Sequence, residues 1–228
     1  MEKVLGQCHA EEKCHLSQNA MGKAKEDQMA PAKASLSVNK YADSFLLYVR
    51  DFSGAANKAY ADMARRTLRI KEGPKGRIKL KKNATKVLRQ AVESLKIDSS
   101  DFRKWHEKSC DALIACYGGQ LSYGQAQKWL NMLLKYLYVY DVKGYEALFT
   151  EERIRTMDLP VDTTVIKKLR KYGVNPPAIG WSKWDKGTYC AYQTSARDAL
   201  WSAADIENPD ERIPFYWELI HWSDASEA

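Results

Sequence analysis

The sequence predicts an all-α protein with a multi-helix globular fold. Apolar residues recur every three or four positions through most of the chain, which is the spacing of one helix face. No segment has the alternation of apolar and polar residues that is typical of a half-buried strand, and no internal repeat is visible. With 228 residues the chain is long enough to bury a core of its own, so the fold needs neither a disulfide nor a structural metal.

Composition divides the chain into two parts. Residues 1–36 are rich in Lys, Glu, Gln, Ala and Ser and have few large apolar groups, which predicts a loosely ordered N-terminal extension, with a peripheral helix as the alternative. Residues 37–228 have the apolar content and the length of a single helical domain.

The first helices of this domain follow from apolar faces and from the breaks between them. Aromatic and aliphatic residues in 38–68 predict a helix, with Gly54 as a candidate interruption. Residues 72–76 contain a Gly-Pro pair and predict a break. A second helix is predicted at about residues 84–95, and it stops at the polar residues 98–100.

Residues 101–140 predict a helix-hairpin-helix element. Ser100 has the side chain of an N-cap for the first helix, which ends at Gly118 and Gly119. The second helix, at about residues 123–140, is apolar over so wide a surface that we expect it to be the central helix of the core.

Shorter helices are predicted in the C-terminal part. One is expected near residues 145–149, and another opens at Leu159-Pro160 and stops near Gly173. The remaining residues are rich in aromatic side chains and predict two more helices.

The positive charge is concentrated in one segment. The whole chain carries +7, whereas residues 62–89 hold eleven Lys or Arg and two acids, a local charge of +9. Such a segment suits a phosphate backbone, because each neutralised phosphate releases counterions. The other interpretation is a face that only keeps the protein soluble. The candidate DNA contacts in this segment are Arg77, Lys79, Lys81 and Lys82.

The five cysteines are odd in number and lack the dense spacing of a secreted disulfide scaffold. They are therefore interpreted as reduced thiols, which predicts a cytoplasmic protein. No apolar run approaches the roughly 20 residues of a membrane span, so we expect no membrane association. The sequence predicts no metal site and no cofactor.

Lys128 and Asp162 are the candidate catalytic residues. They lie 34 positions apart, and each stands near the start of a predicted helix. A lysine amine is a nucleophile only when it is uncharged, a state that burial favours, and a nearby carboxylate can stabilise positive charge or relay a proton. The alternative interpretation is an exposed lysine on an amphipathic helix and an aspartate that caps the next helix.

At these residues the chain resembles the helix-hairpin-helix superfamily of base-excision DNA glycosylases. That family has the motif Leu-Pro-Gly-Val-Gly-Arg-Lys-Thr-Ala-Asn, followed later by Val-Asp-Thr-His. Gly124, Lys128 and Asn131 fall on its first glycine, its lysine and its asparagine, and residues 161–163 match Val-Asp-Thr. The wide separation of lysine and aspartate is most similar to the archaeal 8-oxoguanine DNA glycosylase branch. Other family positions differ here: Ser122 and Tyr123 replace Leu-Pro, Ala126 replaces the second glycine and Thr164 replaces the histidine.

The resemblance implies a DNA glycosylase that removes a damaged base from duplex DNA through a Schiff base on Lys128, with Asp162 as its partner. It also implies an AP-lyase activity, which nicks the strand by β-elimination. A hairpin of this kind offers backbone amides to a phosphate, and the candidates are Gly118, Gly119, Gly124 and Gln125. The base is flipped into an aromatic or apolar pocket, for which the candidates are Trp129, Trp181 and Trp184.

Two other functions fit the same residues. One is a non-catalytic helical module that binds nucleic acid or a partner protein, in which the basic segment binds and Lys128 has no chemical role. The other is a scaffold protein whose basic face keeps it soluble.

Overall fold

The computed structural model describes residues 49–97 and 101–223, of which residues 222 and 223 are described by their backbone only. The predicted extension at residues 1–36 lies outside the described residues. The part of the chain that is described contains eight α-helices, four short 3-10 helices and no strand, so the all-α prediction is confirmed. The α-helices are α2 (Phe52–Thr67), α3 (Pro74–Ile97), α4 (Phe102–Cys116), α5 (Tyr123–Val139), α6 (Glu151–Thr156), α7 (Thr163–Leu169), α8 (Lys186–Ser202) and α9 (Pro214–Ser223). The 3-10 helices are η1 (Glu146–Leu148), η2 (Arg170–Tyr172), η3 (Trp181–Lys183) and η4 (Pro209–Arg212).

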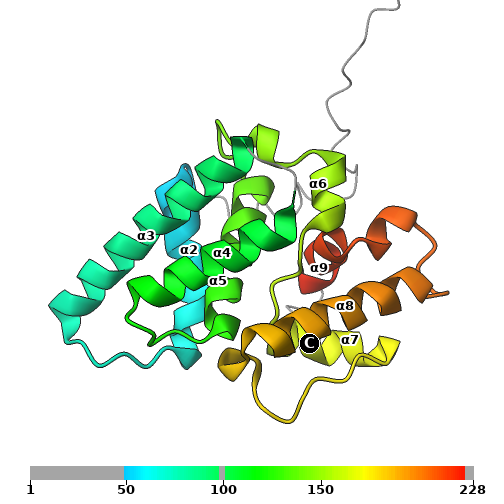
Figure 1. The fold of residues 1–228 in the computed structure, drawn as a ribbon. Helices are drawn as coiled ribbons and strands as arrows, with labels where there is room; N and C mark the ends of the chain where they lie inside the picture. Colours follow the sequence, from blue (N-terminus) through cyan, green and yellow to red (C-terminus); the bar gives the residue numbers. More distant parts are fainter. Residues whose placement is uncertain (1–48, 98–100, 224–228) are drawn as a thin grey trace, which may run out of the picture. The chain divides into compact units, whose positions relative to one another are not determined.

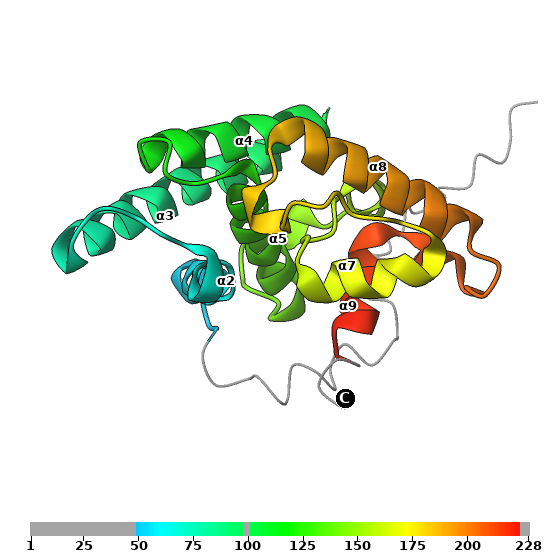
Figure 2. The same ribbon diagram turned by 90° about the horizontal axis from the view of Figure 1, so that it is seen from below.

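Helix α5 is the central helix, as its wide apolar surface predicts. Every residue from Tyr123 to Leu137 is buried. Helices α2, α3 and α4 lie on one side of α5, and α7, α8 and α9 lie on the other (Figures 1 and 2). Because α5 is covered on all sides, its polar residues are buried as well, and buried polar groups need partners inside the protein.

The helices α2 and α3 begin elsewhere than predicted. The Oδ1 atom of Asp51 accepts a hydrogen bond from the Gly54 amide and caps α2, so Gly54 lies in the first turn and does not interrupt the helix. The residues before 49 lie outside the description. Helix α3 begins at Pro74, ten residues earlier than expected. A proline in the first turn of a helix lacks only an N–H that would have no partner in the helix, and its fixed φ suits the helix.

Helices α4 and α5 lie where the sequence predicts the helix-hairpin-helix element, which itself stays a prediction. Asp101 caps α4, and Ser100 lies outside the described residues. Gly118 and Gly119 follow α4 with φ values of 58° and 76°, the left-handed region that favours glycine. Helix α5 begins with a capping box, in which Ser122 and Gln125 each accept a hydrogen bond from the other's backbone amide.

The segment between α6 and α7 is non-helical, and this decides the geometry of the site. The prediction that a helix opens at Leu159-Pro160 is wrong by several residues, since α7 begins at Thr163 with Asp162 as its N-cap. Helix α6 was not predicted. Residues 157–162 cross the side of α5 without secondary structure, so their backbone groups need side-chain partners. Among the helices in the described parts of the chain, none has the length and apolar character that crossing a membrane requires.

Candidate active site

The structure brings Lys128 and Asp162 into direct contact. The Nζ atom of Lys128 lies 2.6 Å from Oδ2 of Asp162, which makes a hydrogen-bonded ion pair. Lys128 projects from the second turn of α5, and its side chain is only 3% exposed, against 19% for that of Asp162. A cavity of about 320 Å³ reaches this pair, and it is lined by the end of α2, by α5, by the start of α7 and by η3.

Asp162 has two roles, one for each carboxylate oxygen. Oδ2 accepts from Lys128, whereas Oδ1 accepts from the Val165 amide and caps α7. Burial of this carboxyl acts to raise its pKa, but the charge and hydrogen bond of Lys128 and the Val165 amide outweigh it and lower the pKa. Asp162 is therefore an ionised carboxylate at neutral pH. The amine of the pair has to lose its proton before it can act as a nucleophile.

Two buried polar side chains of α5 hold the segment that carries Asp162. The Gln127 amide donates to the Val161 carbonyl at 3.1 Å and accepts from the Val161 amide at 3.3 Å. Asn131 donates to the Leu159 carbonyl at 3.4 Å. These bonds place Asp162 beside Lys128. Sequence reasoning missed Gln127, although a polar side chain in a helix that is expected to be central needs a partner inside the protein.

A buried hydrogen-bond network continues from Asn131 to the other end of this segment. Asn131 donates to the Tyr189 hydroxyl at 2.9 Å, and that hydroxyl donates to Asp158 at 3.0 Å. Asp158 also forms an ion pair with Arg197 at 3.1 Å. The network therefore fixes the non-helical segment at both ends.

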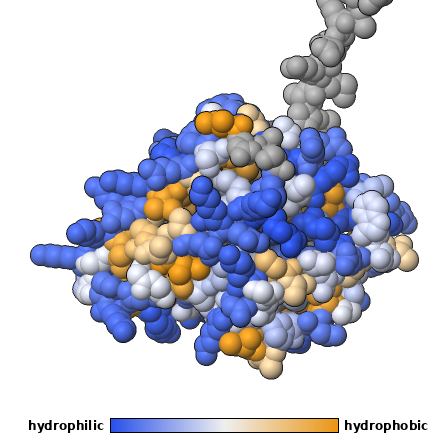
Figure 3. Space-filling model, in the orientation of Figure 1, coloured by the Kyte–Doolittle hydropathy of each residue, from blue (hydrophilic) through white to orange (hydrophobic). Residues whose placement is uncertain are grey.

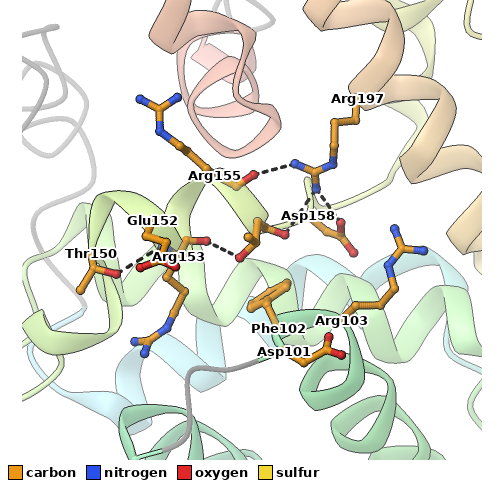
Figure 4. A pocket seen from close by; sticks show the side chains of 10 residues that line it. Asp101, Phe102, Arg103, Thr150, Glu152, Arg153, Arg155, Asp158 and Arg197 are labelled. Atoms are coloured by element: carbon orange, nitrogen blue, oxygen red, sulfur yellow. Dashed lines mark hydrogen bonds and ion pairs between the residues drawn. The ribbon is translucent and has the colours of Figure 1, made fainter. Parts of the chain in front are cut away.

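Arg197 binds the chain where this segment begins, and Figure 4 shows its bonds to Arg155 and Asp158. Its guanidinium donates to the backbone carbonyls of Arg155 and Met157 and to the Asp158 carboxylate. Arg155, Asp158 and Arg197 line a second cavity, of about 550 Å³, together with Arg103. Because Arg197 is bound to the chain itself, we assign it a structural role.

The network includes a buried histidine, and this predicts a pH dependence of stability. His106 lies 3.0 Å from the Oδ1 atom of Asn131, and burial lowers its pKa in spite of the opposing effects of Asp158 and Asn131. Below about pH 6.5 the unfolded chain binds a proton that the folded chain excludes, so the free energy of unfolding decreases as the pH falls, by up to about 1.4 kcal/mol for each pH unit.

We expect His106→Gln to remove this part of the pH dependence. Urea unfolding at pH 7 and pH 5 gives the change in the free energy of unfolding between these pH values for each protein. Because carboxylates contribute similarly to both proteins, the difference between the two changes is the contribution of His106. The wild type should lose about 1 kcal/mol more than the variant between these pH values. Equal losses would show that His106 does not resist protonation in the folded state.

Only one of the three candidate base-pocket tryptophans lies at the cavity. Trp181 is partly exposed and lines it. Trp129 is fully buried and donates to the Ala56 carbonyl, and Trp184 is 1% exposed and donates to the Ile179 carbonyl. Trp129 and Trp184 belong to the core, and no base can stack on them in this conformation.

The four candidate hairpin residues do not offer free amides to a phosphate. The amides of Gly118 and Gly119 donate to carbonyls of α4 and close its C-terminal end. The Gly124 amide donates to the carbonyl of the residue that follows η3, at 3.0 Å, and the Gln125 amide donates to the N-cap hydroxyl of α5. The N-terminal end of α5 is thus covered by the chain itself, and the function proposed below does not use these four residues.

Gly124 is needed for this close packing. A Cβ atom at this position would lie 1.9 Å from the backbone oxygen of Trp181. We expect Gly124→Ala to destabilise the protein by about 1–3 kcal/mol, because a backbone group cannot move aside as a flexible side chain can. Thermal melting measures the change. Gly187→Ala in α8 is the matched control, since its Cβ would meet nothing closer than 3.8 Å. Equal melting temperatures for both variants would contradict the packing argument.

The candidate basic residues divide into two groups. Lys79 and Lys82 are exposed on α3. Arg77 donates to the carbonyls of Glu72 and Ile70, whereas Lys81 lies 4.7 Å from the centre of the Tyr60 ring, where burial lowers its pKa. The sequence predicts that Arg77 and Lys81 contact DNA, but both side chains already have partners within the protein.

Two arginines of the basic segment line the cavity, although the sequence does not single them out as site residues. Arg65 and Arg66, in the last turn of α2, are exposed and line the cavity beside Lys128 and Asp162. The cavity is lined by a lysine amine, two guanidinium groups and the carboxylates of Asp62 and Asp162, so cations outnumber anions by three to two. This set suits nucleophilic chemistry on an anionic substrate. Comparison with protein-family models, with curated proteins and with solved structures gave no match.

Proposed function

We propose that the protein is a DNA glycosylase with AP-lyase activity, which removes a damaged base through a Schiff base on Lys128. The observation that carries this proposal is the 2.6 Å contact between Lys128 and Asp162, which both line the same cavity. The resemblance of these two residues and their neighbours to the helix-hairpin-helix glycosylases, nearest to the archaeal 8-oxoguanine branch, supports the same chemistry.

The reaction begins with the ion pair. As the N-glycosidic bond breaks, the departing base takes a proton from the Lys128 ammonium, and the freed amine bonds to C1′ of the sugar. A second proton moves from the nitrogen to the ring oxygen, the ring opens, and a protonated Schiff base remains. The Asp162 carboxylate, 2.6 Å from the amine, stabilises the positive charge that develops on the sugar.

Strand cleavage follows from the same intermediate. The Asp162 carboxylate takes a proton from C2′, and the C3′–O bond breaks with its electron pair leaving on the 3′-phosphate, which completes the β-elimination. Water then hydrolyses the Schiff base and restores Lys128. Arg65 and Arg66 lie at the cavity where they can bind the phosphates that flank the sugar. Trp181 lies on the cavity wall, where a flipped base can stack.

Borohydride trapping tests the proposal. Borohydride reduces a Schiff base to a stable amine, so protein and DNA become covalently joined. Duplexes that each contain one lesion, together with a duplex that contains an abasic site, are incubated with the wild type and borohydride. We expect an adduct on at least one of them and none on undamaged duplex, and peptide mass spectrometry should locate it on Lys128. No adduct across the panel, or an adduct on another lysine, would overturn the proposal.

A non-catalytic nucleic-acid-binding module is the second candidate, and the exposed Lys79 and Lys82 favour it. It predicts salt-sensitive binding that survives Lys128→Met and Asp162→Asn, with no adduct in the trapping experiment.

A further inference from the structure

The exposed face of α3 carries a row of four lysines. Lys75, Lys79, Lys82 and Lys86 are spaced by four, three and four residues, which places them on one face of a helix. All four are exposed, whereas the opposite face of α3 is buried at Ala84. These four residues are called the lysine stripe.

Within the part of the chain that the structure describes, no carboxylate neutralises the lysine stripe. Among the described residues, none of the four lysines has an ion-pair partner. The sequence of α3 contains one acid, Glu93, which pairs with Lys96 beyond the stripe. Figure 3 shows hydrophilic side chains projecting from the edge of the domain where Figure 1 places α3. This row of charges therefore faces solvent.

The length of the row matches a run of phosphates. Eleven positions separate Lys75 from Lys86, which is about 16 Å along a helix at 1.5 Å per residue. The two strands of a DNA duplex together carry a phosphate about every 1.7 Å of duplex axis, so this length of duplex carries more phosphates than the stripe has lysines. Each flexible lysine side chain can reach one of these phosphates.

We propose that the lysine stripe is a docking surface for the phosphate backbone of double-stranded DNA, and that it binds without regard to sequence. Phosphate contacts of this kind position a protein on a duplex without reading its bases. An anionic membrane is the less suitable partner, because a helix that lies on a lipid surface inserts a continuous apolar face. Helix α3 buries its apolar face in the protein and exposes only two isolated large apolar residues, Ile78 and Ile97. This inference goes beyond the proposed function, since it requires no chemistry at Lys128.

The lysine stripe contains other residues than the DNA contact that the sequence predicts on this helix. Lys75 and Lys86 join Lys79 and Lys82, whereas Arg77 and Lys81 project from other faces of α3. The difference matters because only residues on one helix face can contact one backbone together.

The experiment measures the affinity for an undamaged, fluorescent 20-base-pair duplex between 50 and 200 mM KCl. In the stripe variant all four lysines become glutamine, which removes charge but retains helix propensity. Relative to the wild type, we expect the slope of log Kobs against log salt to become less negative by about 3–4, and the affinity at 50 mM KCl to fall at least about 10-fold.

The control variant removes the same charge elsewhere, with glutamine in place of the exposed Lys104, Lys108, Lys143 and Lys171. It should retain the wild-type slope within about one unit. Circular dichroism checks that both variants are folded. The docking surface would be overturned if the stripe variant kept the wild-type slope. It would also be overturned if the control variant changed the slope as much as the stripe variant does. Binding of the wild type to anionic phosphatidylserine vesicles but not to the duplex would overturn it as well. None of these outcomes depends on adduct formation, so a failure here is distinct from a failure of the proposed chemistry.

Discussion

Replacing Lys128 by methionine is expected to reduce borohydride trapping at least about 100-fold, because no other nucleophile takes part in the proposed reaction. Methionine has a similar length and can fill the buried site, while Asp162 retains its bond to the Val165 amide. Gel analysis of single-turnover trapping on the abasic duplex measures the loss. Lys183→Met is the control, because Lys183 is an exposed lysine of η3, a segment that lines the cavity.

Asp162→Asn separates catalysis from helix capping. Asparagine is as good an N-cap as aspartate, so α7 should keep its start and the melting temperature should change little. The missing charge should slow trapping by about 10²–10⁴-fold, the range of a positioned acid–base group. If Lys128→Met traps more than a tenth as much as the wild type, or if Asp162→Asn reacts at the wild-type rate, the pair has only a structural role.

Glu218→Leu is expected to lower the free energy of unfolding by about 3–5 kcal/mol, because it removes the carboxylate that neutralises a buried lysine. Nζ of Lys135, on α5, lies 2.7 Å from Oε2 of Glu218, on α9, with side-chain exposures of 4% and 1%. Burial lowers the pKa of Lys135, and the Glu218 charge opposes this effect. Without Glu218 the desolvation cost of the ammonium is no longer offset.

The double variant Lys135→Met with Glu218→Leu should recover most of that loss, since well-packed apolar side chains replace buried ion pairs at little cost. Urea unfolding of the two single variants and the double variant gives the interaction energy. The control is Glu151→Gln, whose partner Arg155 lies 2.5 Å away with exposures of 47% and 67%, and which should change stability by less than about 1 kcal/mol. If the double variant is no more stable than Glu218→Leu, the loss of stability in Glu218→Leu does not come from leaving a buried charge unpaired.

The arrangement of helices was predictable where local chemistry decides it. The turn at Gly118 and Gly119 and the wide apolar surface of α5 depend on neighbouring residues, so the sequence predicted both. The start of α3 at Pro74 was missed, because a proline ends a helix or begins one and only the packing of the following residues tells which.

The candidate site divides in the same way. The sequence determined the fold class, and the resemblance of its motifs to a known family selected Lys128 and Asp162. Only the tertiary structure decided that they touch, because their contact depends on how Gln127 and Asn131 bind a segment some thirty residues further along the chain. It also decided which tryptophans enter the core and which lysines share a face of α3. Periodicity tells which residues of a helix turn inward, but what they meet there is set by the packing of distant elements.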